Sequence, residues 1–190
     1  MAARRVAWGA LAIASAGLAL VAAAPPARRD WNAVVARTPQ GTHLLGSPAA
    51  SVRLTEFVSY TCPHCAEFER EAEAPLRLTF VAGGQGSIEV RHFVRDPVDM
   101  TVALLTNCGP PAKFFANHTA FLRGQAAWIG PLTAPTPAQR ARWTGGAFAQ
   151  RTRAIAQDFG FYPIMRRRGY TPAQVDRCLA DEALAERLAA

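Results

Sequence analysis

The pattern of apolar and polar residues divides the chain into three stretches. Residues 6–24 are apolar and carry no charge. Residues 51–97 change from a strand-like composition to a helical pattern and back again. From residue 98 onward, apolar residues recur at helical spacing. We therefore expect an α/β chain in which one strand–helix–strand unit precedes a block of helices.

The strand–helix–strand unit begins with Ser51–Tyr60, which is rich in β-branched and aromatic residues without clean alternation. This composition predicts a strand buried on both faces, as parallel strands of α/β proteins are. From Cys62 a helical pattern follows, with Pro63 in its first turn and Pro75 at an expected kink. Ser87–Val94 predicts a second strand. A right-handed crossover would make the two strands parallel.

Proline, alanine and turn-forming residues dominate residues 24–50, and strand signals stop after Pro97. The earlier segment predicts an extended arm that leads into the domain. The later one predicts helices, because the pairs Thr136-Pro137 and Thr171-Pro172 are typical helix starts. The expected helices are Asp99–Cys108, Pro111–Gly124, Pro137–Thr144, Ala147–Phe159, Phe161–Arg168 and Thr171–Ala189.

The first 23 residues have the layout of a secretory signal peptide. Arg4 and Arg5 precede the apolar run, and small residues precede a cleavage site expected after Ala23. The alternative is an uncleaved membrane anchor, because the run is nearly long enough to span a bilayer. Both interpretations export the domain. The predicted organisation is a signal peptide (1–23), an arm (24–50), a βαβ core (51–97) and a helical subdomain (98–190).

The net charge of +7 does not indicate nucleic-acid binding. Removing Arg4 and Arg5 with the signal peptide lowers it to +5, and Lys113 is the single lysine in the chain. The positive charges are dispersed, apart from the run Arg166–Arg168, which is typical of a solvated helix face. We therefore predict no nucleic-acid partner.

The chain has four cysteines, an even number that is usual for an exported protein in an oxidising compartment. Cys62 and Cys65 are separated by two residues, whereas Cys108 and Cys178 each stand alone. The close pair leaves the distant two for each other. We therefore predict a structural Cys108–Cys178 disulfide within the helical subdomain; two buried free cysteines are the alternative.

Cys62 and Cys65 form the sequence Cys-Pro-His-Cys at the start of the predicted helix. The unpaired N–H groups of a first helical turn stabilise an anion, and His64 can add a hydrogen bond or a charge, so the Cys62 thiol should ionise readily. Cys65, one turn further on, should be more buried and act as the resolving thiol. Two alternatives are a zinc site, which lacks a second pair of ligands, and a structural crosslink, which would close only a tiny loop. We predict a redox pair, tuned by Pro63 and His64, and no metal or cofactor.

The segment FVSYTCPHCAEF, placed after an export signal and before a helical block, resembles the DsbA-like thioredoxin family of periplasmic disulfide oxidoreductases. The order of elements is similar from about Trp31 to Ala190. The resemblance implies a thioredoxin-like fold with an inserted helical subdomain, an attacking Cys62 and a resolving Cys65. It also implies a periplasmic location, reduced exported polypeptides as substrates, and a membrane quinone-linked partner that reoxidises the pair.

One departure from the family pattern concerns the end of the chain. Family members continue after the helical insertion with a cis-proline loop, two antiparallel strands and a final helix, whereas this chain stops at DEALAERLAA. We therefore expect a shortened sheet with an unpaired edge. The leading hypothesis is a disulfide-donating oxidoreductase. A disulfide isomerase or reductase, and a truncated binding protein that keeps the motif, are the alternatives.

Overall fold

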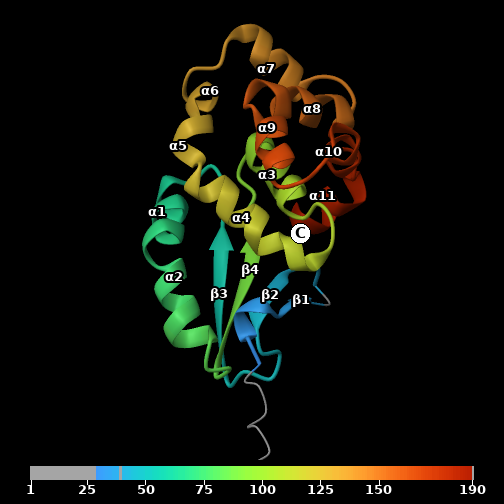
Figure 1. Cartoon of the computed structure of the whole chain (residues 1–190). Helices are drawn as coiled ribbons and strands as arrows, with labels where there is room; N and C mark the ends of the chain where they lie inside the picture. Colours follow the sequence, from blue (N-terminus) through green and yellow to red (C-terminus); the bar gives the residue numbers. More distant parts are fainter. Residues whose placement is uncertain (1–28, 39, 190) are drawn as a thin grey trace, which may run out of the picture.

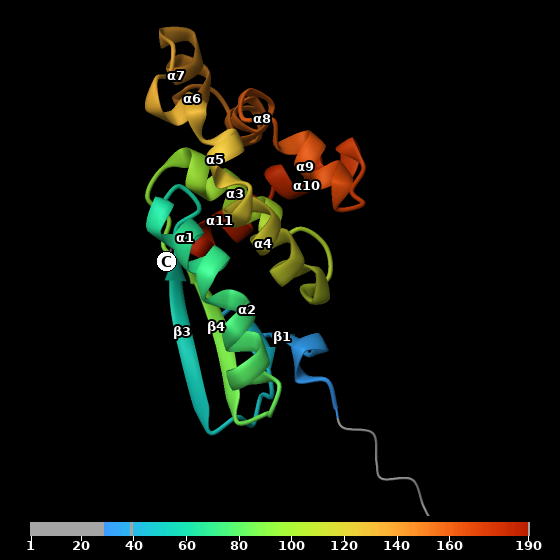
Figure 2. The same cartoon turned by 60° about the vertical axis from the view of Figure 1, so that its left-hand side comes forward.

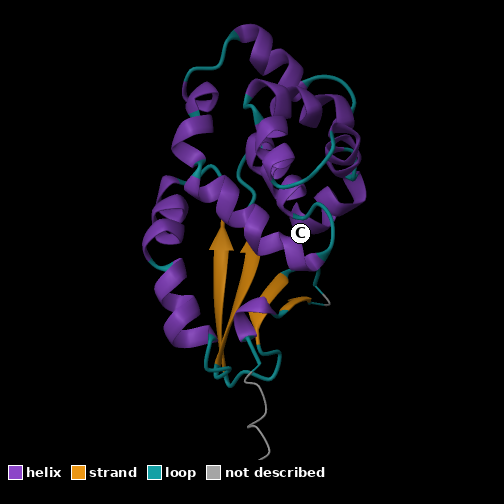
Figure 3. Cartoon of the chain, viewed as in Figure 1, coloured by secondary structure: helices purple, strands orange, loops and turns teal. Residues whose placement is uncertain are grey.

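The computed structural model describes residues 29–38 and 40–189, which form a mixed four-stranded sheet with a block of helices above one end (Figure 1, Figure 3). The strands are β1 (Val35–Arg37), β2 (His43–Gly46), β3 (Val52–Val58) and β4 (Gly86–His92). Their order in the sheet is β1-β2-β4-β3. The predicted signal peptide lies outside the described residues.

The predicted βαβ unit is confirmed. Strands β3 and β4 pair in parallel, in a register that runs from Val52 opposite Gly86 to Val58 opposite His92. Between them lie α1 (Pro63–Glu71), α2 (Glu73–Leu76) and a π-helical segment (Arg77–Val81), which follow one face of the sheet (Figure 2). The helix is divided at Ala72 rather than at Pro75.

The prediction of an extended arm is wrong for residues 35–46. A short 3-10 turn (Trp31–Ala33) is followed by β1 and β2, which pair with each other, and β2 pairs antiparallel with β4. All four residues of β2 are buried. These strands have three and four residues, which is too short for a recognisable alternation of apolar and polar positions, and β2 is held by a strand more than forty residues away.

The prediction that β3 is buried on both faces is also wrong, because every residue of this edge strand except Val58 is exposed or half-buried. Its partner β4 is largely buried, but Val52 and Phe57 of β3 are 55% and 64% exposed. Among the described residues, no strand follows β4, and the outer edge of β3 pairs with nothing. In Figure 2 this edge forms the margin of the molecule. An unpaired, partly apolar edge is open to association with another chain.

The predicted helical segments after Pro97 are confirmed, with Thr171–Ala189 forming two helices. Two further short helices lie at residues 125–128 and 130–133, where none was predicted. Thr136 and Thr171 each close a capping box at the start of their helices. The helices of this block are α3 (Pro97–Thr106), α4 (Phe114–Arg123, after a 3-10 turn at Pro111–Lys113), α5 (Gln125–Trp128), α6 (Gly130–Thr133), α7 (Pro137–Thr144), α8 (Phe148–Asp158), α9 (Phe161–Arg167), α10 (Pro172–Leu179) and α11 (Glu182–Ala189).

One hydrophobic core runs from the sheet into the helical block. Its largest fully buried side chains include Tyr60 after β3, Phe114 and Phe121 on α4, and Phe161 on α9. The continuity of this core means that the sheet and the helices are packed together rather than linked as separate lobes. In the described part of the chain, no helix combines the length and the apolar character needed to cross a bilayer.

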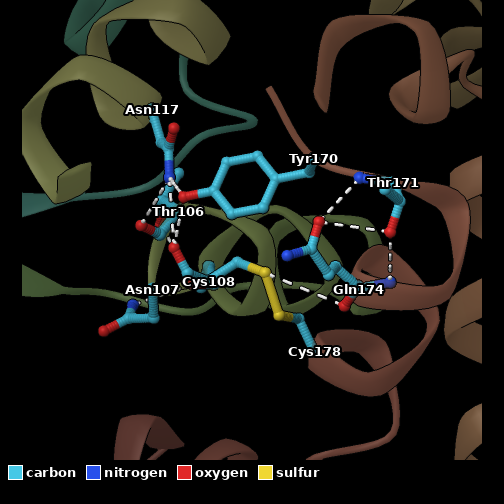
Figure 4. The surroundings of a disulfide bond; sticks show 9 residues. Thr106, Asn107, Cys108, Asn117, Tyr170, Thr171, Gln174 and Cys178 are labelled. Carbon is cyan, nitrogen blue, oxygen red and sulfur yellow. Dashed lines mark hydrogen bonds between the residues drawn. A yellow bond between two sulfur atoms is a disulfide. The ribbon is translucent and has the colours of Figure 1, made fainter. Parts of the chain in front are cut away.

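Cys108 and Cys178, paired in the sequence analysis, are joined by a disulfide in the structure (Figure 4). The bond links Cys108, two residues after the end of α3, to Cys178 of α10, with 5.6 Å between the two Cα atoms. Beside it, the Tyr170 hydroxyl donates a hydrogen bond of 2.6 Å to the Cys108 carbonyl. The disulfide and this hydrogen bond together fasten the last third of the chain to α3.

Candidate active site

Cys62 lies where the end of β3 turns into α1. It is the N-cap residue of α1, with extended backbone angles, and Pro63 occupies the first helical position. Its N–H group donates to the Ser59 carbonyl at 3.2 Å, which fixes the turn that carries it. Proline suits this position because the first N–H groups of a helix have no partner within the helix. The sequence therefore places a thiol at the positive end of the helix dipole.

The surroundings displace the pKa values of the two thiols in opposite directions. Burial raises the pKa of Cys62, but hydrogen bonds from Cys65 and the His64 backbone, and the charge of Arg95, outweigh it, so the pKa is lowered overall. Burial is the main cause of the raised pKa of Cys65, and the neighbouring Cys62 raises it further. Both thiols are half-buried and free in this structure. The arrangement supplies a ready anion at Cys62 and a protonated partner one turn further on.

His64 and Pro63 were predicted to tune the Cys62 thiol, and the structure assigns His64 a different contact from the expected one. Its ring lies almost wholly in solvent, with Nδ1 3.8 Å from the Glu67 carboxylate. The backbone N–H of His64, rather than its ring, favours the Cys62 anion. The ring instead lines a groove beside Cys65.

The turn before Cys62 is fastened to the first turn of α3. Asp99, which is buried, accepts hydrogen bonds from the Tyr60 N–H at 2.7 Å and from the Ser59 hydroxyl at 2.5 Å. Asp96, the N-cap of α3, accepts one from the Thr61 hydroxyl at 2.7 Å. Two carboxylates at the start of one helix therefore hold the backbone that presents the nucleophile at the start of another.

Arg95 completes this polar cluster, a position that was not predicted from the sequence. Its Nε donates to the Ser59 hydroxyl at 2.8 Å and its Nη2 to the Thr61 hydroxyl at 3.2 Å. Its charge acts on both sulfurs and contributes to lowering the pKa of Cys62. The guanidinium is exposed, so solvent weakens this contribution.

A groove of about 370 Å³ runs between β3 and α1 beside Cys65. Its walls are mainly apolar, and Phe57 and Phe68 are both exposed along it. Leu54 and Leu122 also line it. Exposed aromatic side chains next to Cys65 offer a surface on which an unfolded polypeptide segment can lie.

Two carboxylates, Glu56 and Glu69, also line this groove. Burial, followed by the charge of Glu69, raises the pKa of Glu56 to about 7, and burial likewise raises the pKa of Glu69. Helix α4 covers Glu69 and leaves it 3% exposed. A carboxylate whose pKa lies near neutrality, in the same groove as Cys65, is suited to taking up and releasing a proton there.

Three histidines that appear isolated in the sequence meet around one aromatic ring. His43 stacks on Phe114 with 3.9 Å between ring centroids, and His92 and His118 lie 5.9 and 5.7 Å from the same ring. Burial is the main cause that lowers their pKa values, to about 3 for His43 and His118 and about 4 for His92. These rings are therefore neutral in the folded protein.

Buried neutral histidines make the fold sensitive to acid. The unfolded chain binds protons at His43 below its ordinary pKa of about 6.5, whereas the folded chain does so only near 3, so stability is lost as the pH falls through this window. Lowering the pH from about 7.5 to about 5 should decrease the free energy of unfolding of the wild type. We expect this decrease to be about 2 kcal/mol smaller in the His43→Leu variant. Urea denaturation at both pH values measures this difference.

The comparison with wild type is needed because Glu56 acts in the opposite direction: its raised pKa favours the folded state as the pH falls. That contribution is common to both proteins and cancels. An equal acid-induced loss in the two proteins would show that His43 is not a source of the sensitivity.

Among the described residues, no three histidine, cysteine, aspartate or glutamate side chains gather as a metal site would require. The predicted site residues Cys62, Pro63, His64 and Cys65 lie together at the start of α1. The Cys108–Cys178 disulfide lies beyond the other end of α3. The contributions of Arg95, Asp96, Asp99 and the buried glutamates to the site around Cys62 and Cys65 were not predicted from the sequence.

Known proteins are similar to this chain over most of its length. A family model described as Thioredoxin matches residues 38–189. A Rickettsia typhi protein provisionally named protein-disulfide oxidoreductase is 24% identical over 148 residues, which are 77% of this chain and 46% of that protein. A Rickettsia felis protein with the same provisional name gives 24% identity over 77% of this chain and 45% of its own length. The chain thus spans less than half the length of these curated relatives.

Two solved structures resemble the fold. A protein-disulfide isomerase from Novosphingobium aromaticivorans is 63% identical, with a TM-score of 0.75, over 78% of this chain and 76% of that one. Wolbachia pipientis alpha-DsbA1 has a TM-score of 0.61 over 77% of this chain and 63% of its own, at 18% identity. The second similarity is one of fold alone.

Proposed function

Because this chain belongs to the thioredoxin family, we propose that it is a protein thiol–disulfide oxidoreductase that introduces disulfides into exported proteins. The observation that carries the proposal is the pairing of Cys62 and Cys65. Cys62 caps the start of α1 and ionises readily, whereas Cys65 lies one turn further on and holds its proton. This asymmetry suits a disulfide that is readily given away.

In the proposed reaction the enzyme starts with a Cys62–Cys65 disulfide. A substrate thiolate attacks the Cys62 sulfur, the bond between the two enzyme sulfurs breaks, and Cys65 leaves and takes up a proton. A second substrate thiolate then attacks the substrate sulfur of the mixed disulfide and releases Cys62 as a thiolate. The substrate loses two electrons and gains a disulfide, while the enzyme becomes a dithiol. The low pKa of Cys62 makes it a good leaving group in the last step.

Glu56 is the proposed proton store for Cys65. The Cys65 thiol must gain a proton when it leaves and lose it when the disulfide is restored, and burial has raised its pKa. Glu56 lines the same groove and ionises at about pH 7, so it can hold that proton without a large cost in free energy.

The compartment and the partners form part of the proposal. The predicted signal peptide supports export to the periplasm, where a disulfide persists. The substrates would be reduced exported polypeptides that lie in the groove between β3 and α1. A membrane quinone-linked protein would return the pair to its disulfide state.

Equilibration with glutathione buffers tests the direction of the reaction. We expect the Cys62–Cys65 couple to have a reduction potential above about −200 mV, because a stabilised Cys62 anion favours the dithiol state. Trapping with acid and mass determination of the alkylated protein gives the dithiol fraction at each buffer ratio. A potential near the −270 mV or so of thioredoxin would contradict a disulfide-donating role.

Disulfide isomerisation is the second candidate, favoured by the name of the Novosphingobium relative at 63% identity. An isomerase acts as the dithiol, and its Cys62 would attack a non-native disulfide. The two functions separate in one assay: oxidised enzyme with a reduced substrate measures donation, and reduced enzyme with a scrambled substrate measures isomerisation. The faster of the two reactions identifies the function.

A further inference from the structure

Gln125 reaches from the helical block to the turn that carries the redox pair. It is the first residue of α5, and its side chain is 5% exposed. Its Nε2 donates to the Tyr60 carbonyl at 2.7 Å and to the Cys62 carbonyl at 2.9 Å. Both hydrogens of one side-chain amide are therefore used on the backbone on either side of Thr61.

These two hydrogen bonds complete the restraint on Cys62. The Cys62 N–H already donates to Ser59, and the Cys62 carbonyl also accepts the first hydrogen bond of α1, from the Ala66 N–H at 3.3 Å. On the opposite side of the turn, Asp99 accepts the Tyr60 N–H. With Gln125 in place, the backbone is held from α3 and from α5 at once, and the sulfur is kept over the first turn of α1.

A buried amide at this position is not required for packing. Burying an amide costs free energy unless it is hydrogen-bonded, and an apolar side chain of similar length would fill the space without that cost. The Gln125 side chain forms both of these bonds with the backbone of the turn Ser59–Cys62, the redox turn, and makes no other hydrogen bond with the described residues. Its chemistry is therefore directed at the redox turn.

The restraint matters more in one redox state than in the other. In the disulfide state a covalent bond fixes the distance between Cys62 and Cys65. In the dithiol state, which this structure represents, only non-covalent contacts hold the two sulfurs in place. The Cys62 thiolate exists only in the dithiol state, so a contact that keeps this sulfur over the unpaired N–H groups of the first turn of α1 stabilises the dithiol state.

We propose that Gln125 is a positioning residue that couples the helical block to the redox pair and stabilises the dithiol state relative to the disulfide. This inference rests on the proposed function. It makes the oxidising strength of the pair depend on a residue of the helical block, 63 positions after Cys62 in the sequence.

The test replaces the amide with an apolar side chain of similar length, Gln125→Met, in the full chain. We expect the equilibrium with glutathione to shift about fivefold toward the disulfide, which lowers the potential by about 20 mV. The ultraviolet absorbance of the Cys62 thiolate should appear at higher pH than in the wild type. Gln125→Asn, whose amide is too short to reach both carbonyls, should shift both readings the same way and is the variant to measure if Gln125→Met does not fold.

Asn117→Leu is the matched control. Asn117 is also a buried amide of the helical block, and its Nδ2 donates to the Tyr170 hydroxyl at 3.0 Å and to two backbone carbonyls near Cys108. Its loss should lower the stability of the fold but leave the potential within about twofold of the wild-type equilibrium.

The outcomes separate the inference from the function on which it rests. A wild-type protein that does not exchange with glutathione would refute the proposed function. Normal exchange with an unchanged potential in the Gln125 variants would refute the role of Gln125. An equal shift in Asn117→Leu would also refute it, because the effect would then follow from general destabilisation.

Discussion

Replacement of Cys62 by serine is expected to reduce thiol–disulfide exchange to the rate of the reaction without protein, whereas Cys65→Ser should accumulate a mixed disulfide at Cys62. The reason is the opposite displacement of the two pKa values, which favours the thiolate at Cys62 and the thiol at Cys65. A larger share of Cys62 than of Cys65 is ionised, and burial limits access to Cys65, so capture by Cys65 alone should be roughly tenfold slower than capture by Cys62 alone.

A peptide that contains one disulfide serves as the probe. The Cys62 thiolate of the Cys65→Ser variant attacks the peptide, forms a mixed disulfide and releases one peptide thiolate, and without Cys65 the product persists. Mass spectrometry of the intact protein measures the captured peptide over time. Faster capture by the Cys62→Ser variant would reverse the assigned roles of the two sulfurs.

Replacement of both Cys108 and Cys178 by alanine is expected to lower the free energy of unfolding by about 4 kcal/mol. The disulfide closes a loop across a sequence separation of 70, and its removal returns that loop's freedom to the unfolded chain. For a domain of this size, such a loss lowers the melting temperature by about 10 °C. Thermal and urea denaturation of the oxidised proteins measure both values.

The hydrogen bond from Tyr170 to the Cys108 carbonyl involves main-chain oxygen, so it survives this substitution and isolates the effect of the crosslink (Figure 4). Tyr170→Phe provides the complementary measurement, with an expected cost of about 1 kcal/mol. If removing both cysteines had no larger effect than Tyr170→Phe, the disulfide would not be a stabilising element.

The parts of the fold that the sequence predicted correctly depend on local signals. The strands β3 and β4, the helix that starts with Pro63, and the capping boxes at Thr136 and Thr171 each follow from residues within a few positions of one another. The Cys62–Cys65 pair is equally local. These features were predictable because their physical causes lie inside the segments themselves.

The parts that the sequence did not predict depend on contacts between distant segments. Strand β2 joins the sheet through its pairing with the distant strand β4, and Glu69 is buried because α4 covers it. His43 and His118 meet through Phe114, and Gln125 reaches a turn more than sixty residues earlier. A single sequence contains no signal for such pairings, because each residue is ordinary in its own neighbourhood.

The fastening of the redox turn to α3 limits what can be transplanted. Asp96 and Asp99 hold the backbone ahead of Cys62, and both lie outside the strand and helix that contain the tetrapeptide. Grafting Cys-Pro-His-Cys onto another strand and helix would transfer the four residues without the hydrogen bonds that Asp96 and Asp99 accept. A designed protein with this reactivity needs the beginning of α3 as well, because the site is built from two segments that are separate in the sequence.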